Sequence, residues 1–417
     1  MLSIPRPWLF ATLLSLTPGV IGALSPTFPQ PRGTGPAVGR AVYFITNDES
    51  NAVVALPIGH DGKLSPGSVT LTDGTGAVAL NGNNQPATPD ALVSQSALTI
   101  SGDAIFAVNA GSNTLSMLAI SPSDPTQLTL VGKPVSIPGE FPNTVGASSK
   151  HNLVCVGTTG ARAGIACSSF SASRGLSPMD ELRPFDLGQT TPPVGPTNTV
   201  SQVFFSANED TLFATVKGNP AANKTGFFSA FPVKRGGSTC SQGAGKRATV
   251  SRVEQRSMPG DTAVLFGSQT VPGTHNVFAT DAAFGAAILA VDPRSGRATT
   301  VATGKVSGQV ATCWVTISLA TGTAFVTDVG MNRLVEMSLK DASILSQLDL
   351  SGNGDPGLID LRAAGNFIYA LSPGNGTTKA AVTVVDVSGR SGSAVMVQHF
   401  GLDGAAGRRA MGMAVLV

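Results

Sequence analysis

The feature that most constrains the fold of this 417-residue chain is a short pattern that occurs seven times. Each copy is a polar turn followed by an apolar run with one large residue at its centre. Neighbouring centres lie 44 to 65 residues apart, which is the spacing at which propeller blades repeat. The seven runs are Ala41–Phe44, Ala104–Ala107, Leu153–Val156, Thr211–Ala214, Asn276–Ala279, Thr323–Val326 and Asn366–Tyr369. We therefore expect an all-β protein, a seven-bladed β-propeller.

The composition agrees with this expectation. The chain has 49 Gly and 28 Pro, only 12% charged residues, and many short apolar runs bounded by turn residues. Such runs are typical of strands and not of amphipathic helices. The net charge is +2 and the cations form no dense stripe. Because nucleic-acid binding requires clustered cations, we exclude it.

The N-terminus has the pattern of a secretory signal, with Arg6, an apolar core over residues 8–16 and small residues at Gly22 and Ala23. We predict a signal peptide over residues 1–23, a flexible Pro/Gly-rich leader over 24–40 and the propeller over 41–417. The apolar core is too short to span a bilayer comfortably, and no later stretch is long enough. Sequons at Asn223 and Asn375 predict N-glycosylation in polar turns. We expect a secreted glycoprotein, extracellular or in a cell wall.

The first unit has three expected strands, whereas later units begin with an additional apolar strand. Residues 410–417 form an apolar strand with no turn or partner after it. If this tail supplies the missing strand of the first unit, the ring closes and no sheet edge is left exposed between the first and last units. We therefore predict closure by pairing of the C-terminal strand with the N-terminal blade.

The chain has four cysteines, which readily form disulfides in a secreted protein. Cys155 and Cys167 lie on consecutive expected strands of one blade, and Cys240 and Cys313 remain as a second pair. Three pairings are possible, and the sequence does not choose among them.

Residues just ahead of each inner strand gather around one mouth of the central channel of a propeller. Val93–Gln95 and Val200–Gln202 share a tripeptide, each eleven residues ahead of a central Phe. Placing the other blades in the same way gives the candidate ligand-binding set Gln95, Thr144, Gln202, His275, Trp314, Arg408 and Arg409. We assign no catalytic residue among them.

Each of these side chains also has a structural interpretation. His275 has no carboxylate or metal partner nearby in sequence, which favours a structural role. Trp314 either stacks on a ligand or packs between blades, and the second is favoured. Arg408 and Arg409 either clamp a carboxylate or are solvated and ion-paired. No His pair has metal-ligand spacing and no phosphate loop is present, so we expect no metal and no cofactor.

The chain resembles the seven-bladed lactonase family, which includes 6-phosphogluconolactonase and fungal 3-carboxymuconate cyclase. The resemblance covers residues 41–417 and rests on the blade pattern, for example Leu98–Asn109. It looks most similar to the secreted fungal branch, whose members include cell-wall glycoproteins and adhesin-like antigens. The resemblance implies a seven-bladed propeller that binds an anionic carboxylate substrate. Active members carry Gly-Pro-Arg-His ahead of inner strands, where this chain has Val-Ser-Gln and Pro-Asn-Thr, and only Gly407–Arg409 retains arginine.

Lactone chemistry needs an acid/base at the reacting carbon and cations for the carboxylate. With Gln, Asn and Thr at these positions, we predict a non-catalytic extracellular or cell-wall binding or adhesion protein. The alternative is an extracellular lactonase or carboxymuconate cyclase that uses Arg408, Arg409, His275 and Gln202. The expected partner is a small anionic or carbohydrate ligand, or a component of the host matrix or cell wall, bound by a monomer.

Overall fold

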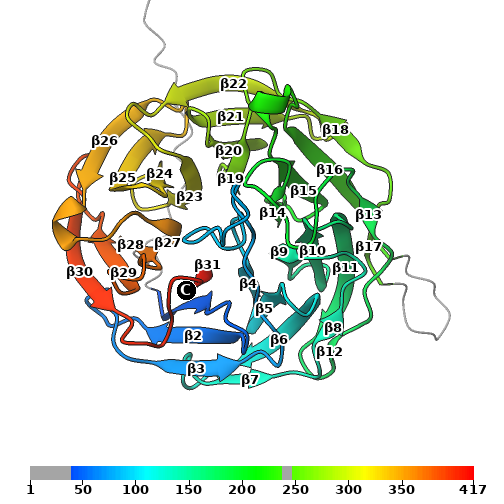
Figure 1. Cartoon of the computed structure of the whole chain (residues 1–417), viewed down its shortest axis with the longest axis horizontal. Helices are drawn as coiled ribbons and strands as arrows, with labels where there is room; N and C mark the ends of the chain where they lie inside the picture. Colours follow the sequence, from blue (N-terminus) through cyan, green and yellow to red (C-terminus); the bar gives the residue numbers. More distant parts are fainter. Residues whose placement is uncertain (1–38, 237–246) are drawn as a thin grey trace, which may run out of the picture. The chain divides into compact units, whose positions relative to one another are not determined.

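The computed structural model describes residues 39–236 and 247–417. The predicted signal peptide, nearly all of the predicted leader, and Cys240 lie outside the described residues. The described residues fall in one unit, Gly35–Val417. Within it, seven antiparallel sheets are arranged around a central axis, which confirms the seven-bladed propeller (Figure 1).

Each blade is a sheet of four or five strands that follow one another outward from the axis, and in the five-stranded blades the last two strands both pair with the third. Blade one contains β31 (Met411–Leu416), β1 (Ala41–Ile45), β2 (Ala52–Pro57) and β3 (Ser68–Leu71). Blade two contains β4 (Leu98–Ser101), β5 (Ala104–Asn109), β6 (Thr114–Ile120), β7 (Leu128–Leu130) and β8 (Val135–Ser136). Blade three contains β9 (Pro142–Ser148), β10 (Leu153–Thr158), β11 (Gly164–Ser171), β12 (Gly175–Leu176) and β13 (Arg183–Pro184). Blade four contains β14 (Val200–Phe205), β15 (Thr211–Val216), β16 (Phe227–Lys234), β17 (Thr249–Val250) and β18 (Gln255–Ser257).

The remaining blades have four strands each. Blade five contains β19 (Leu265–Thr270), β20 (Asn276–Asp281), β21 (Gly285–Val291) and β22 (Ala298–Lys305). Blade six contains β23 (Thr312–Ser318), β24 (Thr323–Asp328), β25 (Met331–Ser338) and β26 (Ile344–Asp349). Blade seven contains β27 (Ile359–Ala364), β28 (Phe367–Ser372), β29 (Ala381–Asp386) and β30 (Val395–Gly401). Two short 3₁₀ turns, Pro220–Ala222 and Ser351–Asn353, are the helical elements among the described residues.

Burial explains the sequence pattern of each blade. The second strand is covered on both faces by neighbouring blades, so it is apolar almost throughout, as in β5, where every residue is buried. The outer strands face solvent on one side and alternate, as in β26. The large central residue of each second strand fills the space between blades; Phe106, Phe278 and Phe325 are all fully buried.

The C-terminal strand closes the ring, as predicted. β31 is antiparallel to β1, with Ala41 opposite Leu416 and Tyr43 opposite Ala414. The Arg40 amide donates to the Leu416 carbonyl at 2.7 Å, which extends the pairing beyond the strand. β1 therefore pairs with β2 on one side and with β31 on the other, so neither of its edges is left unpaired.

A disulfide joins Cys155 of β10 to Cys167 of β11, directly opposite in the register of the two strands. This is one of the pairings that the sequence left open. Cys313 lies buried in β23 and forms no disulfide with a described cysteine. No helix among the described residues is long and apolar enough to cross a membrane.

Candidate functional site

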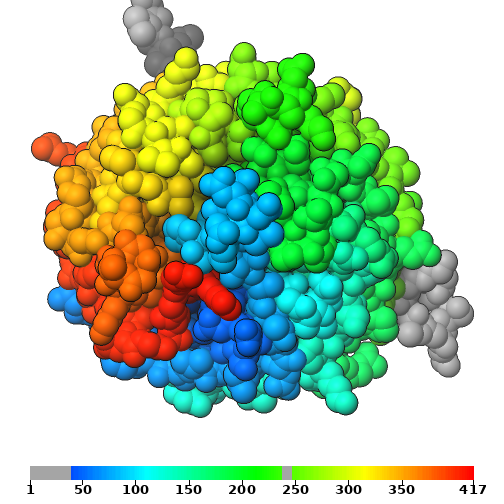
Figure 2. All heavy atoms as spheres, in the orientation of Figure 1, coloured from blue at the N-terminus to red at the C-terminus, as the bar shows by residue number. Residues whose placement is uncertain are grey.

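The mouth of the channel, where the inner strands begin, is covered by a segment of the chain itself. Residues 72–97 join β3 to β4, and we call them the channel segment. The segment runs over the centre of the ring (Figure 1) and covers the centre of this face in the space-filling view, in light blue (Figure 2). Near its tip, the Leu80 amide donates to Pro193 and its carbonyl accepts from Gly195, both at 2.9 Å. The mouth is therefore occupied by protein.

Gln95, the first of the predicted mouth residues, ties the channel segment to blade six. Its amide group donates to the Val315 carbonyl at 2.9 Å and accepts from the Val315 amide at 3.1 Å. Gly267 of β19 makes this approach possible, because a Cβ at that position would lie 1.9 Å from Gln95 Oε1. The Gln95 side chain is buried and both of its polar atoms are paired with backbone.

Thr144 and Gln202 make the corresponding bonds in blades three and four. Thr144 Oγ1 donates to the Gln95 carbonyl at 2.8 Å. Gln202 Oε1 accepts from the Ser268 amide at 2.6 Å, and its Nε2 donates to Ser96 Oγ at 3.3 Å. Both side chains are buried and hold neighbouring inner strands and the channel segment together.

Trp314 is fully buried in β23. Its ring lies 5.0 Å from that of Phe266 in an edge arrangement, and its Nε1 donates to the Ser94 carbonyl at 3.0 Å. The structure therefore places Gln95, Thr144, Gln202 and Trp314 at one mouth and commits their polar atoms to internal hydrogen bonds. Little of their hydrogen-bonding capacity is left for a ligand.

His275 does not join this group. The inner strand of blade five is β19, and His275 is exposed in the turn that follows it. The expectation that residues 273–275 precede the inner strand is therefore incorrect. The eleven-residue spacing explains the difference: Thr144, Gln202 and Trp314 each lie eleven residues ahead of a strand centre, and in blade five that position is Gly267.

Arg408 and Arg409 precede β31, as expected. Arg408 is exposed and Arg409 half-buried. Arg408 lines a surface pocket of about 400 Å3 together with Lys379 and Asp403. Neither guanidinium is among the ion-paired arginines of the described chain.

Sequence reasoning missed an ion pair inside the channel. Asp360 of β27 is fully buried and its Oδ1 accepts from Arg362 Nη1 at 2.7 Å. Its Oδ2 accepts the amides of Ser96 at 3.2 Å and of Met413 at 3.0 Å. One carboxylate thus connects the channel segment, the closing strand and blade seven. Burial raises the pKa of Asp360, although Arg362 opposes the shift.

A second missed group lies where the channel segment meets blades four to six. Lys217, directly after β15, is 2% exposed and its Nζ donates to the Val93 carbonyl at 2.6 Å and to Ser201 Oγ at 3.3 Å. The same nitrogen is 4.3 Å from the centre of the Phe266 ring. Val93 has a φ of 50°, a conformation that is unusual for a β-branched residue. The lysine therefore holds a strained turn of the channel segment in place.

Lys217, Asp90 and Cys313 line one cavity of about 250 Å3. The rest of its wall is mainly apolar, from both the channel segment and the blades: Ala87, Pro89, Val93, Pro196, Val264, Phe266, Ala282, Ala311 and Val329. Asp90 is partly buried, but its Oδ1 is enclosed and accepts no hydrogen bond from a described residue. Asp90 and Lys217 interact electrostatically without forming a direct ion pair.

A departure from the blade repeat identifies this lysine in the sequence. When the second strands are aligned on their large central residue, the third residue after that centre is polar in six blades: Thr46, Asn109, Thr158, Asp281, Asp328 and Ser372. Blade four has Val216 at this position and places its polar residue one step later, at Lys217. The next position is apolar in blades two, five and six, as Ala110, Ala282 and Val329. Burial of a lysine at an otherwise apolar position costs folding free energy unless its ammonium group is paired and hydrogen-bonded.

Burial shifts the pKa values of both charged groups toward neutrality. It raises the pKa of Asp90 to about 7, against the opposing effect of Lys217. It lowers the pKa of Lys217 to about 8, and Asp90 opposes this shift. Burial also raises the pKa of the Cys313 thiol, so this sulfur stays protonated.

These pKa values predict a minimum in the pH profile of stability. An unfolded aspartate titrates near pH 3.9, so from about pH 4 to 7 the folded state binds the extra proton and the free energy of unfolding falls as pH rises. An unfolded lysine titrates near pH 10.4, so from about pH 8 to 10 the unfolded state binds the extra proton and stability rises. Urea unfolding from pH 4 to 10 should show a flatter profile for Asp90→Asn/Lys217→Met than for wild type. Identical profiles would contradict the assignment.

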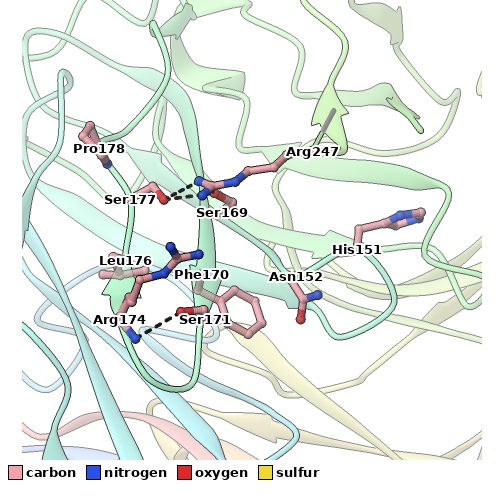
Figure 3. Close-up of a pocket in the computed structure, with 11 residues that line it drawn as sticks. His151, Asn152, Ser169, Phe170, Ser171, Arg174, Leu176, Ser177, Pro178 and Arg247 are labelled. Carbon is pink, nitrogen blue, oxygen red and sulfur yellow. Dashed lines mark hydrogen bonds between the residues drawn. The ribbon is translucent and has the colours of Figure 1, made fainter. Parts of the chain in front are cut away.

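A pocket of about 480 Å3 lies on the outer side of blade three, over β11 and β12 (Figure 3). Arg247 lies just before β17 of blade four, and its Nη1 donates to the hydroxyls of Ser169 and Ser177, both at 2.8 Å. Arg174 and the Phe170 ring also line the pocket. No acidic side chain is among the described residues that line it, so two guanidinium groups share the pocket without a carboxylate.

The fold is shared with several solved structures. The periplasmic gluconolactonase of Pseudomonas aeruginosa matches with a TM-score of 0.59 and 13% identity, over 90% of this chain and 99% of that one. A Bacteroides fragilis protein provisionally assigned as a 6-phosphogluconolactonase matches with a TM-score of 0.54 and 10% identity, over 91% and 98%. A hypothetical selenium-binding protein from Sulfolobus tokodaii matches with a TM-score of 0.55 and 9% identity, over 91% and 94%.

No family model and no curated protein matches the chain in sequence. The chain is therefore an all-β seven-bladed propeller that shares its fold with these structures. At identities of 9 to 13%, the similarity extends to the fold alone.

Proposed function

We propose that the protein is a secreted propeller that binds a small anionic saccharide and does not turn over lactones. The observation that carries the proposal is the closed mouth of the channel. Gln95, Thr144, Gln202 and Trp314 all use polar atoms to hold the channel segment. A lactonase needs an acid/base and cations around an accessible substrate, and this mouth supplies hydrogen bonds to its own backbone instead.

The pocket on blade three supports an anionic saccharide as the ligand class. Arg174 and Arg247 bring two positive charges, and guanidinium groups bind carboxylates through paired hydrogen bonds. The Ser169 and Ser177 hydroxyls both accept from Arg247, and Ser169 donates to Ser177 at 3.1 Å, which leaves the Ser177 hydroxyl proton for a sugar oxygen. The Phe170 ring adds an apolar surface for a sugar face. Uronic acids combine these three features.

Two further observations are compatible with secretion. The Cys155–Cys167 disulfide is of the kind that persists in oxidising compartments. Asn223 and Asn375 both lie exposed in turns where a glycan has room. At Asn375 the side-chain oxygen accepts from the Thr377 hydroxyl at 2.7 Å, so the two polar sequon residues already contact each other.

The binding proposal is tested with galacturonate and glucuronate by calorimetry. Arg174→Ala/Arg247→Ala should weaken binding by at least about 100-fold, because it removes two guanidinium groups and each charged hydrogen bond contributes about 1.5–3 kcal/mol. Arg252→Ala/Arg294→Ala is the matched control, with the same change in net charge at arginines outside the pocket, and should bind as wild type does. Equal loss in both double variants, or no binding by the wild type, would refute this ligand and site.

The enzymatic alternative is tested separately with a panel of lactones and cis,cis-muconates. We expect no conversion above the uncatalysed rate. Saturable turnover that Arg408→Ala/Arg409→Ala abolishes would replace the binding proposal with a lactonase or cyclase that acts at the other basic pocket.

A further inference from the structure

The Lys217 amine lines the cavity between the channel segment and blades four to six, and it takes no part in the proposed saccharide binding. We propose that this cavity captures a small apolar aldehyde or ketone, which Lys217 binds covalently as an imine. This site is separate from the pocket on blade three, and the inference goes beyond the proposed function. It depends on Lys217, on the carboxyl group of Asp90 and on the apolar walls that line the same cavity.

The environment of Lys217 favours a nucleophilic amine. An ammonium group has three protons, and two donor contacts are present, to the Val93 carbonyl and to Ser201 Oγ. Loss of the third proton leaves both hydrogen bonds intact and creates the lone pair that attacks a carbonyl carbon. The cavity wall is apolar and no carboxylate pairs directly with the amine, so the neutral form is accessible near physiological pH; burial lowers the pKa of Lys217 to about 8.

Asp90 supplies the proton transfer that imine formation needs. Its Oδ1 is enclosed, lacks a hydrogen-bond partner among the described residues and belongs to the same cavity. With a pKa raised to about 7 by burial, this carboxyl group both donates and accepts a proton near neutral pH. Because Asp90 Oδ1 is free to accept, it also offers a hydrogen-bond partner to a hydroxyl group of the ligand, such as the one formed when Lys217 adds to the carbonyl.

The chemistry is balanced without a further reactant. The Lys217 nitrogen forms a bond to the carbonyl carbon, and the carbonyl oxygen gains the proton that the nitrogen loses, which gives a carbinolamine. Asp90 then protonates the hydroxyl group, which leaves as water while the nitrogen lone pair forms the C=N bond. The imine nitrogen returns its proton to Asp90. One amine and one carbonyl compound thus give one imine and one water, with no change in oxidation state.

The cavity sets the size and polarity of the ligand. A cavity of about 150 Å3 holds a benzene molecule, so about 250 Å3 admits roughly ten heavy atoms. Phe266, Val264 and Ala282 present apolar surface to it. A carboxylate on the ligand would be repelled by ionised Asp90, which favours an uncharged carbonyl compound.

The test traps the imine in the full secreted chain. The protein is incubated at pH 7.5 with benzaldehyde and cyanoborohydride, which reduces an imine to a stable benzylamine, and the labelled lysines are identified by peptide mass spectrometry. We expect saturable labelling of Lys217 at least tenfold faster than of exposed Lys63 and Lys150 in the same sample. Equal labelling of all three lysines, or labelling of Lys217 that does not saturate, would overturn the proposal.

Two variants separate chemistry from folding. Lys217→Arg keeps a cation at the position but forms no imine, and it should lose the fast labelling. Ala282→Phe fills the cavity while leaving Lys217 in place, so it should slow labelling of Lys217 about tenfold or more without affecting Lys63. If Ala282→Phe folds and labels at the wild-type rate, the aldehyde does not enter this cavity and the proposal fails.

Discussion

A chain that ends at Arg409 is expected not to fold. The eight residues removed include all of β31, whose Met411 and Met413 are fully buried and whose Leu416 is nearly so. Burial of each such side chain contributes about 1.5–3 kcal/mol. Their combined loss, with the backbone bonds to β1, approaches the 5–15 kcal/mol that stabilises a whole domain. The truncation also leaves β1 as an open edge beside the channel, where aggregation starts.

The measurement is near-ultraviolet circular dichroism with urea unfolding. The matched control removes Val417 alone, which is 63% exposed and outside the strand, and should unfold at the wild-type urea concentration. A truncated chain with a cooperative transition near that of the wild type would show that the ring holds without its closing strand.

Replacement of Asp360 by alanine should cost about 3–5 kcal/mol, because it leaves Arg362 without its buried partner. The same change removes the acceptor for the Ser96 and Met413 amides, so it loosens both the channel segment and the closing strand. The free energy of unfolding from urea titration measures the effect.

Asp360→Asn is the informative comparison, since it keeps one acceptor oxygen and removes the charge. We expect its loss to lie between those of wild type and Asp360→Ala. As a control for the loss of one negative charge, Asp186→Ala removes an exposed carboxylate after β13 and should change stability by less than about 0.5 kcal/mol. A loss below about 1 kcal/mol for Asp360→Ala would mean that this carboxylate does not connect the three elements.

The sequence predicts the ring well because each second strand is buried on both faces. An apolar run with a large central residue is what such burial demands, and the seven runs mark the seven blades. Closure was predictable for the same reason: the tail residues 410–417 are too apolar to be left in water. The choice of residues just ahead of the expected inner strands also selected Gln95, Thr144, Gln202 and Trp314, and the structure brings these four together around the channel segment.

What these side chains do there was not predictable from spacing. Gln95 bonds to Val315, 220 residues away in sequence, and only the ring geometry brings them together. The channel segment itself has no strand periodicity, so nothing in its residue pattern indicates that it crosses the axis. Lys217 is different, since its departure from the blade repeat is visible in the sequence and marks a buried cation.

The occupied channel mouth is the central claim, and hydrogen exchange of the channel segment measures it most directly. The Gln95 amide donates to Ser201 and the Ser96 amide to Asp360, whereas residues 82–85 at the tip are exposed. Exchange followed by mass spectrometry should find peptide 92–97 protected about a hundredfold more than peptide 81–86, at a level close to the inner strands. Equal, fast exchange of both peptides would show that the segment leaves the mouth open to substrate.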